Sequence, residues 1–133
     1  AKFFSGAVRV GMAPDGGSSV TLAQLVGLRQ ALRILLTNPT LTAAEAAEIG
    51  LITEVADDDQ LTTRAEELAA ELAALPPLAL SATKRLVWSG VGQSVEQRLA
   101  EEARTVSELS GTADSLEGLR AVIERRPPTF TGR

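Results

Sequence analysis

The apolar pattern of the first part of the chain changes from partial alternation to helical spacing near residue 20. The alternation over residues 3–10 predicts a strand. Its apolar positions are Phe3, Phe4, Val8 and Val10. Leucines then recur at helical spacing on both sides of Gly27, which predicts two short helices that meet at a bend. The second helix is expected to end at Asn38-Pro39, because the residue before a proline disfavours the helical region.

The next segment carries the signals of a short helix followed by a strand. Thr42 and Glu45 have the spacing of a capping box, in which each side chain accepts a hydrogen bond from the other residue's backbone N–H. Gly50 favours a helix end, since glycine adopts the left-handed conformation at low cost. The β-rich run Leu51 to Val55 predicts a short strand.

Four further helices are predicted over residues 58–133. The residues expected to begin them are Asp58 or Asp59, Pro77, Ser94 paired with Gln97, and Thr112. The apolar positions of the last helix, expected to face inward, are Leu116, Leu119, Val122 and Ile123. Because few strands are available to cover these apolar stripes, we expect them to bury against another subunit or against residues outside this chain.

Composition restricts the chemistry that this chain can perform. Its 133 residues, 44% of them hydrophobic, suffice for a domain with a real core. The chain has no Cys, His or Tyr, which excludes disulfides, thiol nucleophiles, imidazole bases and the usual zinc ligand sets, so no metal site is expected. Any proton transfer must therefore use Asp, Glu or Lys. The lack of Cys fits a reducing compartment, and we expect a cytoplasmic location.

Charge argues against nucleic acid as a partner. The net charge is −4, and residues 40–75 hold nine acidic residues against Arg64 alone. Such an acidic stretch repels phosphate backbones, and no basic face is interleaved with aromatic residues. No apolar run reaches the ~18 residues that a membrane span needs. We therefore expect neither nucleic-acid binding nor membrane insertion.

Asp15 is the residue whose surroundings most suggest chemistry. It lies between a proline and two glycines in the stretch VGMAPDGGSS. Pro-Asp-Gly is a common turn, and Asp15 could equally cap the following helix. The functional alternative is a carboxylate in a dry site, where desolvation raises its pKa enough to accept and return a proton. Met12, Val20 and Leu22 are compatible with such a pocket and equally with a core.

Two segments carry a resemblance to a known family. The pattern T-x-x-E-A-x-x-x-G-L begins at Thr42, and E-R-R-P-P-x-F-x-G begins at Glu124. With the rest of the chain, in order, they resemble the C-terminal half of the enoyl-CoA hydratase/isomerase family, the crotonase superfamily. The resemblance implies an α/β fold: residues 1–57 would form the C-terminal part of a ββα spiral, and residues 58–133 a helical region that assembles trimers or hexamers. It also implies acyl-CoA thioesters as substrates and no cofactor besides that CoA substrate.

The resemblance also implies roles for individual residues. When the family pattern is aligned on Gly11 and Pro14, the catalytic glutamate of hydratases falls at Ala7, so that acid is absent. Isomerases and dehalogenases of the family have an aspartate where Asp15 stands, which favours Asp15 as the catalytic base. The residues expected to contact the substrate are Met12, Pro14, Gly16 and Leu22, and those expected near the phosphates of CoA are Arg125 and Arg126.

Three functions remain open at this point. The first is an acyl-CoA isomerase-like enzyme that uses Asp15, and the second is a hydratase or lyase. The third is a non-catalytic piece that mediates oligomerisation. The chain begins without Met, and the glycine-rich segment that supplies the family's oxyanion donors has no counterpart in it. We therefore expect a piece of a longer protein that is not competent for the family chemistry alone, because an enolate without placed donors is costly.

Overall fold

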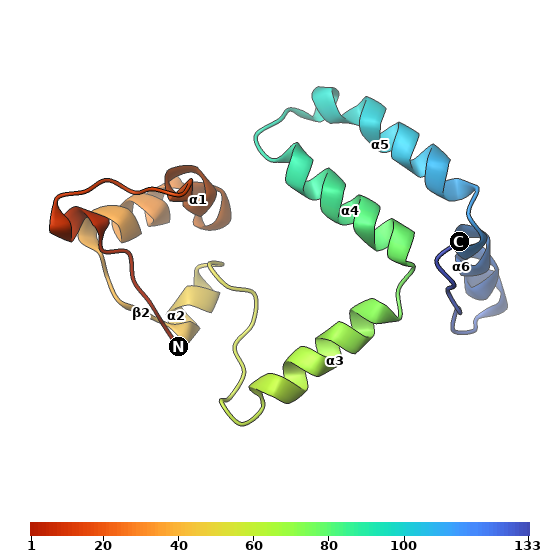
Figure 1. Cartoon of the computed structure of the whole chain (residues 1–133), viewed down its shortest axis with the longest axis horizontal. Helices are drawn as coiled ribbons and strands as arrows, with labels where there is room; N and C mark the ends of the chain where they lie inside the picture. Colours follow the sequence, from red (N-terminus) through yellow and green to blue (C-terminus); the bar gives the residue numbers. More distant parts are fainter. The chain divides into compact units, whose positions relative to one another are not determined.

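The computed structural model describes residues 1–133, which divide into two compact units, Ala1–Leu61 and Thr62–Arg133. Figure 1 shows the elements of each unit in chain order. The elements of the first unit are β1 (Lys2–Phe3), the 3-10 helix η1 (Ala7–Val10), α1 (Ser18–Thr37), β2 (Leu41–Thr42) and α2 (Ala43–Glu48). Those that follow are α3 (Leu61–Ala73), α4 (Pro77–Gly90), α5 (Val95–Ser110) and α6 (Ala113–Glu124). None of the helices combines the length and the apolar character that spanning a membrane requires.

The sheet of the first unit is shorter than the sequence predicts. β1 pairs with β2 in antiparallel fashion, with Phe3 opposite Leu41. Val8 and Val10 lie in η1 and not in a strand, so that part of the predicted strand is wrong. The reason is the lack of a partner: β2 ends where Thr42 becomes the N-cap of α2, which leaves no backbone for a longer β1 to pair with.

The strand predicted for residues 51–55 is also absent. The backbone N–H groups of Leu51 and Ile52 donate to the carbonyl of Ala46, at 2.8 and 3.3 Å. Gly50 makes this return possible with a φ of 76°. Donors that end the helix in this way are not available to a sheet, because each backbone N–H carries a single hydrogen. The segment therefore closes α2.

The predicted bend in α1 is confirmed. Gly27 has a φ of 76° and a ψ of 156°, which interrupts the helix between its two apolar segments. The helix ends at Asn38 as predicted, and Asn38 itself is left-handed, with its amide donating to the carbonyls of Leu35 and Leu36. The buried apolar residues of this unit are Ala31, Ile34, Leu41 and Ala46. They come from α1, β2 and α2, and α2 is the helix that contacts both strands of the small sheet.

The capping box at the start of α2 is confirmed and gives a testable prediction. The Glu45 N–H donates to the Thr42 hydroxyl at 3.2 Å, and the Thr42 N–H donates to the Glu45 carboxylate at 2.8 Å. We expect Thr42→Ala to lower the free energy of unfolding by about 1 kcal/mol in chemical denaturation. Thr53, which is exposed and makes no hydrogen bond through its side chain, is the matched control, and Thr53→Ala should change that free energy by less than about 0.5 kcal/mol.

The effect of Thr42→Ala should also depend on pH. Hydrogen bonds from the Thr42 backbone and side chain hold the pKa of Glu45 below its ordinary value of 4.5. A carboxylate whose pKa is lower in the folded state stabilises the fold above the unfolded pKa, and this contribution is lost as the pH falls through the folded value. The difference between wild type and Thr42→Ala should therefore shrink below about pH 4. Equal differences at pH 3 and pH 7 would contradict this account.

The predicted helix starts of the second unit are confirmed with one exception. Pro77 lies in the first turn of α4, Ser94 forms a capping box with Gln97 on α5, and Thr112 caps α6. Asp58 and Asp59 do not cap α3, which begins only at Leu61. They lie in a turn that the Gln60 N–H closes on the carbonyl of Asp57 at 2.9 Å.

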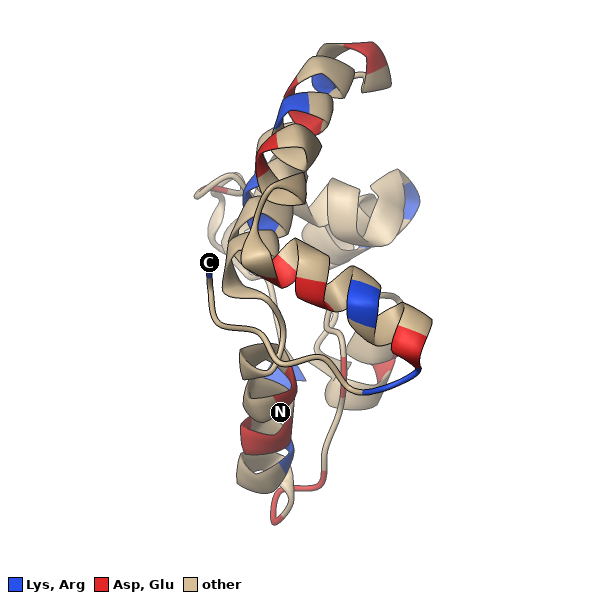
Figure 2. Ribbon diagram, turned by 90° about the vertical axis from the view of Figure 1, so that its right-hand side faces the viewer, with Lys and Arg blue, Asp and Glu red and all other residues tan.

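Helices α4 and α5 are joined by a charged network. Arg85 on α4 and Arg98 on α5 both pair with Glu101, at 2.7 and 2.6 Å. Arg98 also donates to the Ser89 hydroxyl on α4 at 2.7 Å. Acidic and basic residues are interspersed along α5, as Figure 2 shows. This network links α4 to α5 through polar side chains.

Candidate functional site

Backbone hydrogen bonds hold Asp15 in a tight turn before α1. The N–H and the hydroxyl of Ser18 both donate to the Asp15 carbonyl, at 3.0 and 2.7 Å. Gly16 and Gly17 have φ values of 58° and 84°, in the left-handed region that favours glycine. The first turn of the helix then closes on the carbonyl of Gly17, which accepts from the N–H groups of Val20 and Thr21. The backbone of Asp15 is therefore held by the turn and by the Ser18 hydroxyl.

The carboxylate of Asp15 has no structural role within this chain. It is exposed and makes no hydrogen bond or ion pair. The alternative that Asp15 caps α1 is wrong, because the N-cap is Gly17 and no side chain caps this helix. Ser18 instead uses its hydroxyl on the Asp15 carbonyl. A carboxylate on a fixed backbone with no internal partner is available to a molecule bound beside it.

An apolar cavity of about 320 Å³ lies along α1 and the small sheet, and Asp15 is not one of its wall residues. Ser18, whose N–H and hydroxyl hold the Asp15 turn, is one of its few polar wall residues. The walls come from β1 and the loop after it, from both halves of α1, from β2 and from the segment that follows α2. The wall residues are Phe3, Phe4, Ser5, Ser18, Thr21, Leu22, Leu25, Ile34, Leu35, Leu41 and Leu51. Apolar cavities of this size with a few polar groups are typical of sites for small organic ligands.

Only one of the residues predicted to contact the substrate lines this cavity. Leu22 is a wall residue, whereas Met12, Pro14 and Gly16 are not. Met12 is 65% exposed and lies on the loop between η1 and the Asp15 turn. The other residues that line the cavity were not among the contacts predicted from the sequence. The helical spacing of the α1 leucines was a usable signal for Leu25, but the approach of Leu41 depends on strand pairing between distant segments.

The two arginines predicted to meet CoA phosphates differ sharply in their partners. Arg126 donates to both carboxylate oxygens of Glu117, at 2.6 and 2.9 Å, and to Glu124 at 2.6 Å. This pairing raises the pKa of Arg126. Arg125 is the C-cap of α6, and its guanidinium makes no hydrogen bond or ion pair within the chain. Only Arg125 is free to meet an external anion.

Glu117 is held ionised by two donors. The Arg126 guanidinium, foremost, and the Thr129 backbone N–H lower the pKa of Glu117 from 4.5 to about 2. The Thr129 N–H donates to Glu117 at 2.9 Å. The carboxylate thus stays charged at any pH used for an assay, and the contact with Arg126 persists. No group of Asp and Glu side chains is placed to hold a metal ion.

The apolar stripe of α6 does not face inward within the chain as predicted. Val122 and Ile123 are 78% and 81% exposed, and Leu116 and Leu119 are exposed as well. The physical reason is that the C-terminal segment folds back along the opposite face of α6. That segment is anchored on Asp114 and Glu117. The stripe is consequently left without cover.

Known proteins resemble the whole of this chain. Residues 1–133 match the model of the enoyl-CoA hydratase/isomerase family. A probable enoyl-CoA hydratase of Rhodobacter capsulatus is 38% identical over 133 residues, which are 100% of this chain and 52% of that protein. The 1,2-epoxyphenylacetyl-CoA isomerase of Escherichia coli is 34% identical over 134 residues, 100% of this chain and 51% of that protein. The chain therefore spans about half the length of the curated relatives that it matches.

Solved structures show the same likeness. An enoyl-CoA hydratase subunit I from Geobacillus kaustophilus superposes with a TM-score of 0.93 at 32% identity, covering 100% of this chain and 52% of that one. A probable enoyl-CoA hydratase/isomerase from Mycobacterium abscessus gives a TM-score of 0.89 at 33% identity, covering 100% and 55%. These matches confirm the predicted crotonase-type fold. With the family model matched from end to end, the chain belongs to the enoyl-CoA hydratase/isomerase family.

Proposed function

We propose that this chain provides the catalytic base and one CoA-phosphate contact of an acyl-CoA isomerase-like enzyme. Asp15 would take a proton from one carbon of an enoyl-CoA and return it to another. The observation that carries this proposal is that hydrogen bonds from Ser18 hold the backbone of Asp15 in its turn, while the Asp15 carboxylate is bound by no other residue. The apolar cavity beside Ser18 supports an acyl chain as the group bound near it.

The chemistry requires two things of the site. Removing a proton beside the double bond leaves its electron pair delocalised onto the thioester oxygen, and placed N–H donors must stabilise that charge. We expect residues other than those of this chain to supply these donors. Asp15 must also be a strong enough base, which needs the substrate and its surroundings to exclude water from an otherwise exposed carboxylate. The proton returns from the protonated Asp15, so that the enzyme is regenerated.

A hydratase or lyase is the second candidate, favoured by relatives named as enoyl-CoA hydratases. Against it stands Ala7, in η1, where the resemblance implies the hydratase glutamate. The named isomerase among the relatives is 34% identical over the whole chain, close to the values for the hydratases. Overall identity therefore does not distinguish the two activities, and the choice depends on Asp15 and Ala7.

Assembly is part of the same proposal. The stripes of α3 and α6 leave Leu61, Leu72, Leu119 and Ile123 exposed. Monomeric proteins rarely leave apolar surface of this extent uncovered, so we propose that residues 58–133 mediate a homo-oligomer, a trimer or a hexamer. The enzyme would need no cofactor besides its CoA substrate. The absence of Cys supports a location in the cytoplasm.

A direct comparison of substrates tests the activity. The protein, in the form made by its source, is given a 3-enoyl-CoA and a 2-enoyl-CoA in separate assays. We expect conversion of the first to the 2-enoyl isomer to exceed addition of water to the second. Faster formation of the 3-hydroxyacyl product would establish the hydratase alternative. No turnover of either ester, in a folded oligomer, would favour the non-catalytic assembly function.

A further inference from the structure

The C-terminal segment folds back along one face of α6. The N–H groups of Thr131 and Gly132 donate to the two oxygens of Asp114, at 2.7 and 2.8 Å. Asp114 is only 4% exposed, and its own N–H donates to the carbonyl of Arg133 at 2.9 Å. The ring of Phe130 passes over Gly118 on the same helix. The end of the chain is therefore firmly attached to α6.

Glu117 holds both ends of the turn, residues 126–129, at which the chain reverses direction after α6. On one side it binds Arg126 through both carboxylate oxygens, and on the other it accepts from the Thr129 N–H. Paired hydrogen bonds between a guanidinium and a carboxylate constrain direction as well as distance. Arg126 is further held by Glu124 and by the carbonyl of Pro127. The Glu117 side chain thus attaches residues 126–129 to α6 at two points, the Arg126 guanidinium and the Thr129 backbone N–H.

Arg125 lies immediately before this turn in an unusual conformation. Its φ is 53°, in the left-handed region, and the only other non-glycine residue there is Asn38. Helix ends prefer glycine at such a position, because a side chain makes the left-handed conformation costly. Unfavourable backbone conformations persist where neighbouring structure enforces them, often at functional sites. Here the end of α6 itself holds it: the Arg125 N–H donates to the Val122 carbonyl at 3.3 Å and the Arg126 N–H to the Ala121 carbonyl at 3.0 Å. Glu117 then holds the residues that follow, through Arg126 and Thr129.

We propose that Glu117 is a positioning residue that holds Arg125 for contact with a phosphate of CoA. Glu117 pairs with Arg126 and holds the turn that follows Arg125, so that of the two adjacent arginines only Arg125 has a guanidinium without a partner in this chain. This inference rests on the proposed phosphate contact and adds the residue that orients it. Glu117 itself touches no substrate. Its effect should appear in recognition of the nucleotide part of CoA and not in the chemical step.

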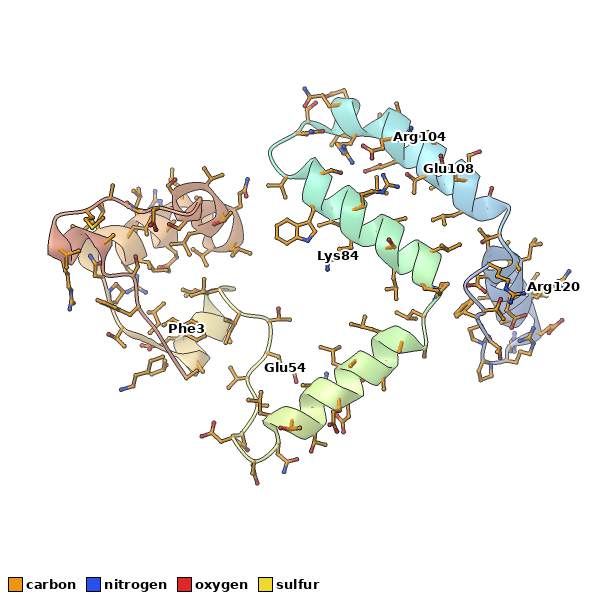
Figure 3. All side chains as sticks on the ribbon, viewed as in Figure 1. Phe3, Glu54, Lys84, Arg104, Glu108 and Arg120 are labelled. Atoms are coloured by element: carbon orange, nitrogen blue, oxygen red, sulfur yellow. The ribbon has the colours of Figure 1, made fainter.

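The test compares an acyl-CoA with the matching acyl-pantetheine thioester, which lacks the nucleotide. In the protein as its source makes it, Glu117→Gln should raise the KM for the acyl-CoA about threefold to tenfold. The kcat and the KM for the pantetheine ester should not change. Arg125→Gln should raise the KM for the acyl-CoA by at least about tenfold. Glu108→Gln is the matched control, because it breaks an exposed ion pair with Arg104 on α5 (Figure 3).

The outcomes separate this inference from the proposed contact. If Arg125→Gln raises the KM for the acyl-CoA and Glu117→Gln does not, the positioning role is overturned and the contact stands. If Arg125→Gln has no effect, the phosphate contact itself is wrong. Should Glu117→Gln fail to fold, Arg126→Gln removes the same ion pair and leaves the Thr129 bond; an unchanged ratio of the two KM values would then overturn the role.

A glycine variant shows whether Arg125 serves the fold. Arg125→Gly places the preferred residue in the left-handed position, so we expect an unchanged or higher melting temperature together with the same rise in the KM for the acyl-CoA. A lower melting temperature with an unchanged KM would show that Arg125 is kept for stability, which contradicts the inference.

Discussion

Replacing Asp15 by Asn is expected to lower kcat for isomerisation of a 3-enoyl-CoA by about 10²–10⁴-fold, the usual contribution of general acid–base catalysis. The substitution keeps the size of the side chain and removes the group that accepts the proton. The turn should survive, because it is held by the Asp15 carbonyl and by two glycines in the left-handed conformation. The melting temperature should therefore stay within about 2 °C of wild type.

Asp58→Asn is the matched control for this experiment. Asp58 is also an exposed aspartate in a turn, and it forms no hydrogen bond or ion pair. Its replacement should alter neither kcat nor stability. Near-normal turnover by Asp15→Asn would show that Asp15 is only a turn residue. A large loss of stability in the same variant would contradict the conclusion that the carboxylate has no structural role.

Introducing a charge into the apolar stripe of α6 is expected to dissociate the proposed oligomer. Ile123 is 81% exposed within the chain, so Ile123→Glu creates no internal clash. In an interface, however, an unpaired carboxylate loses its water, at a cost of several kcal/mol, which corresponds to a more than about 100-fold weaker association. Sedimentation velocity should show a trimer or hexamer for the unmodified protein and smaller species for the variant.

Thr63→Glu controls for the added charge. Thr63 lies on α3, on the side of the helix opposite the stripe that contains Leu61 and Leu72. A carboxylate there should leave the sedimentation coefficient unchanged. An unmodified protein that sediments as a monomer would refute the proposed assembly, and an intact oligomer in Ile123→Glu would exclude this face of α6 from the interface.

Local signals predicted the boundaries of most helices correctly. The caps at Thr42, Ser94 and Thr112 depend on hydrogen bonds within three residues, so the sequence alone carries the necessary information. The bend at Gly27 follows from one glycine between two leucine-rich segments. The strand predictions at Val8 and Val10 were wrong because strand formation depends on a distant partner, and the available one is two residues long.

Contacts between distant residues also limited the prediction of the candidate site. The wall contributed by Leu41 and the coverage of α6 by its own C-terminal segment depend on such contacts. Arg125 and Arg126 are identical in type and adjacent, so no local pattern separates them. The separation comes from Glu117, nine residues before Arg126, which pairs with one arginine and leaves the other free. Asp15, in contrast, was proposed from its turn and from the family resemblance of the chain, both of which are local to the sequence.

The bend at Gly27 restricts which residue can occupy this position of α1 through backbone conformation and not through packing. Apart from its two chain neighbours and the nearby backbone of α1, no atom lies within 4 Å of the point where a side chain at this position would begin, so there is room for larger residues. The combination of φ 76° and ψ 156° is nonetheless open to glycine almost alone. Neighbouring leucines can drift to other apolar residues as long as the core is filled. Position 27 has no such freedom, and any lineage that lost this glycine would have to redirect the half of α1 that begins at the Asp15 turn.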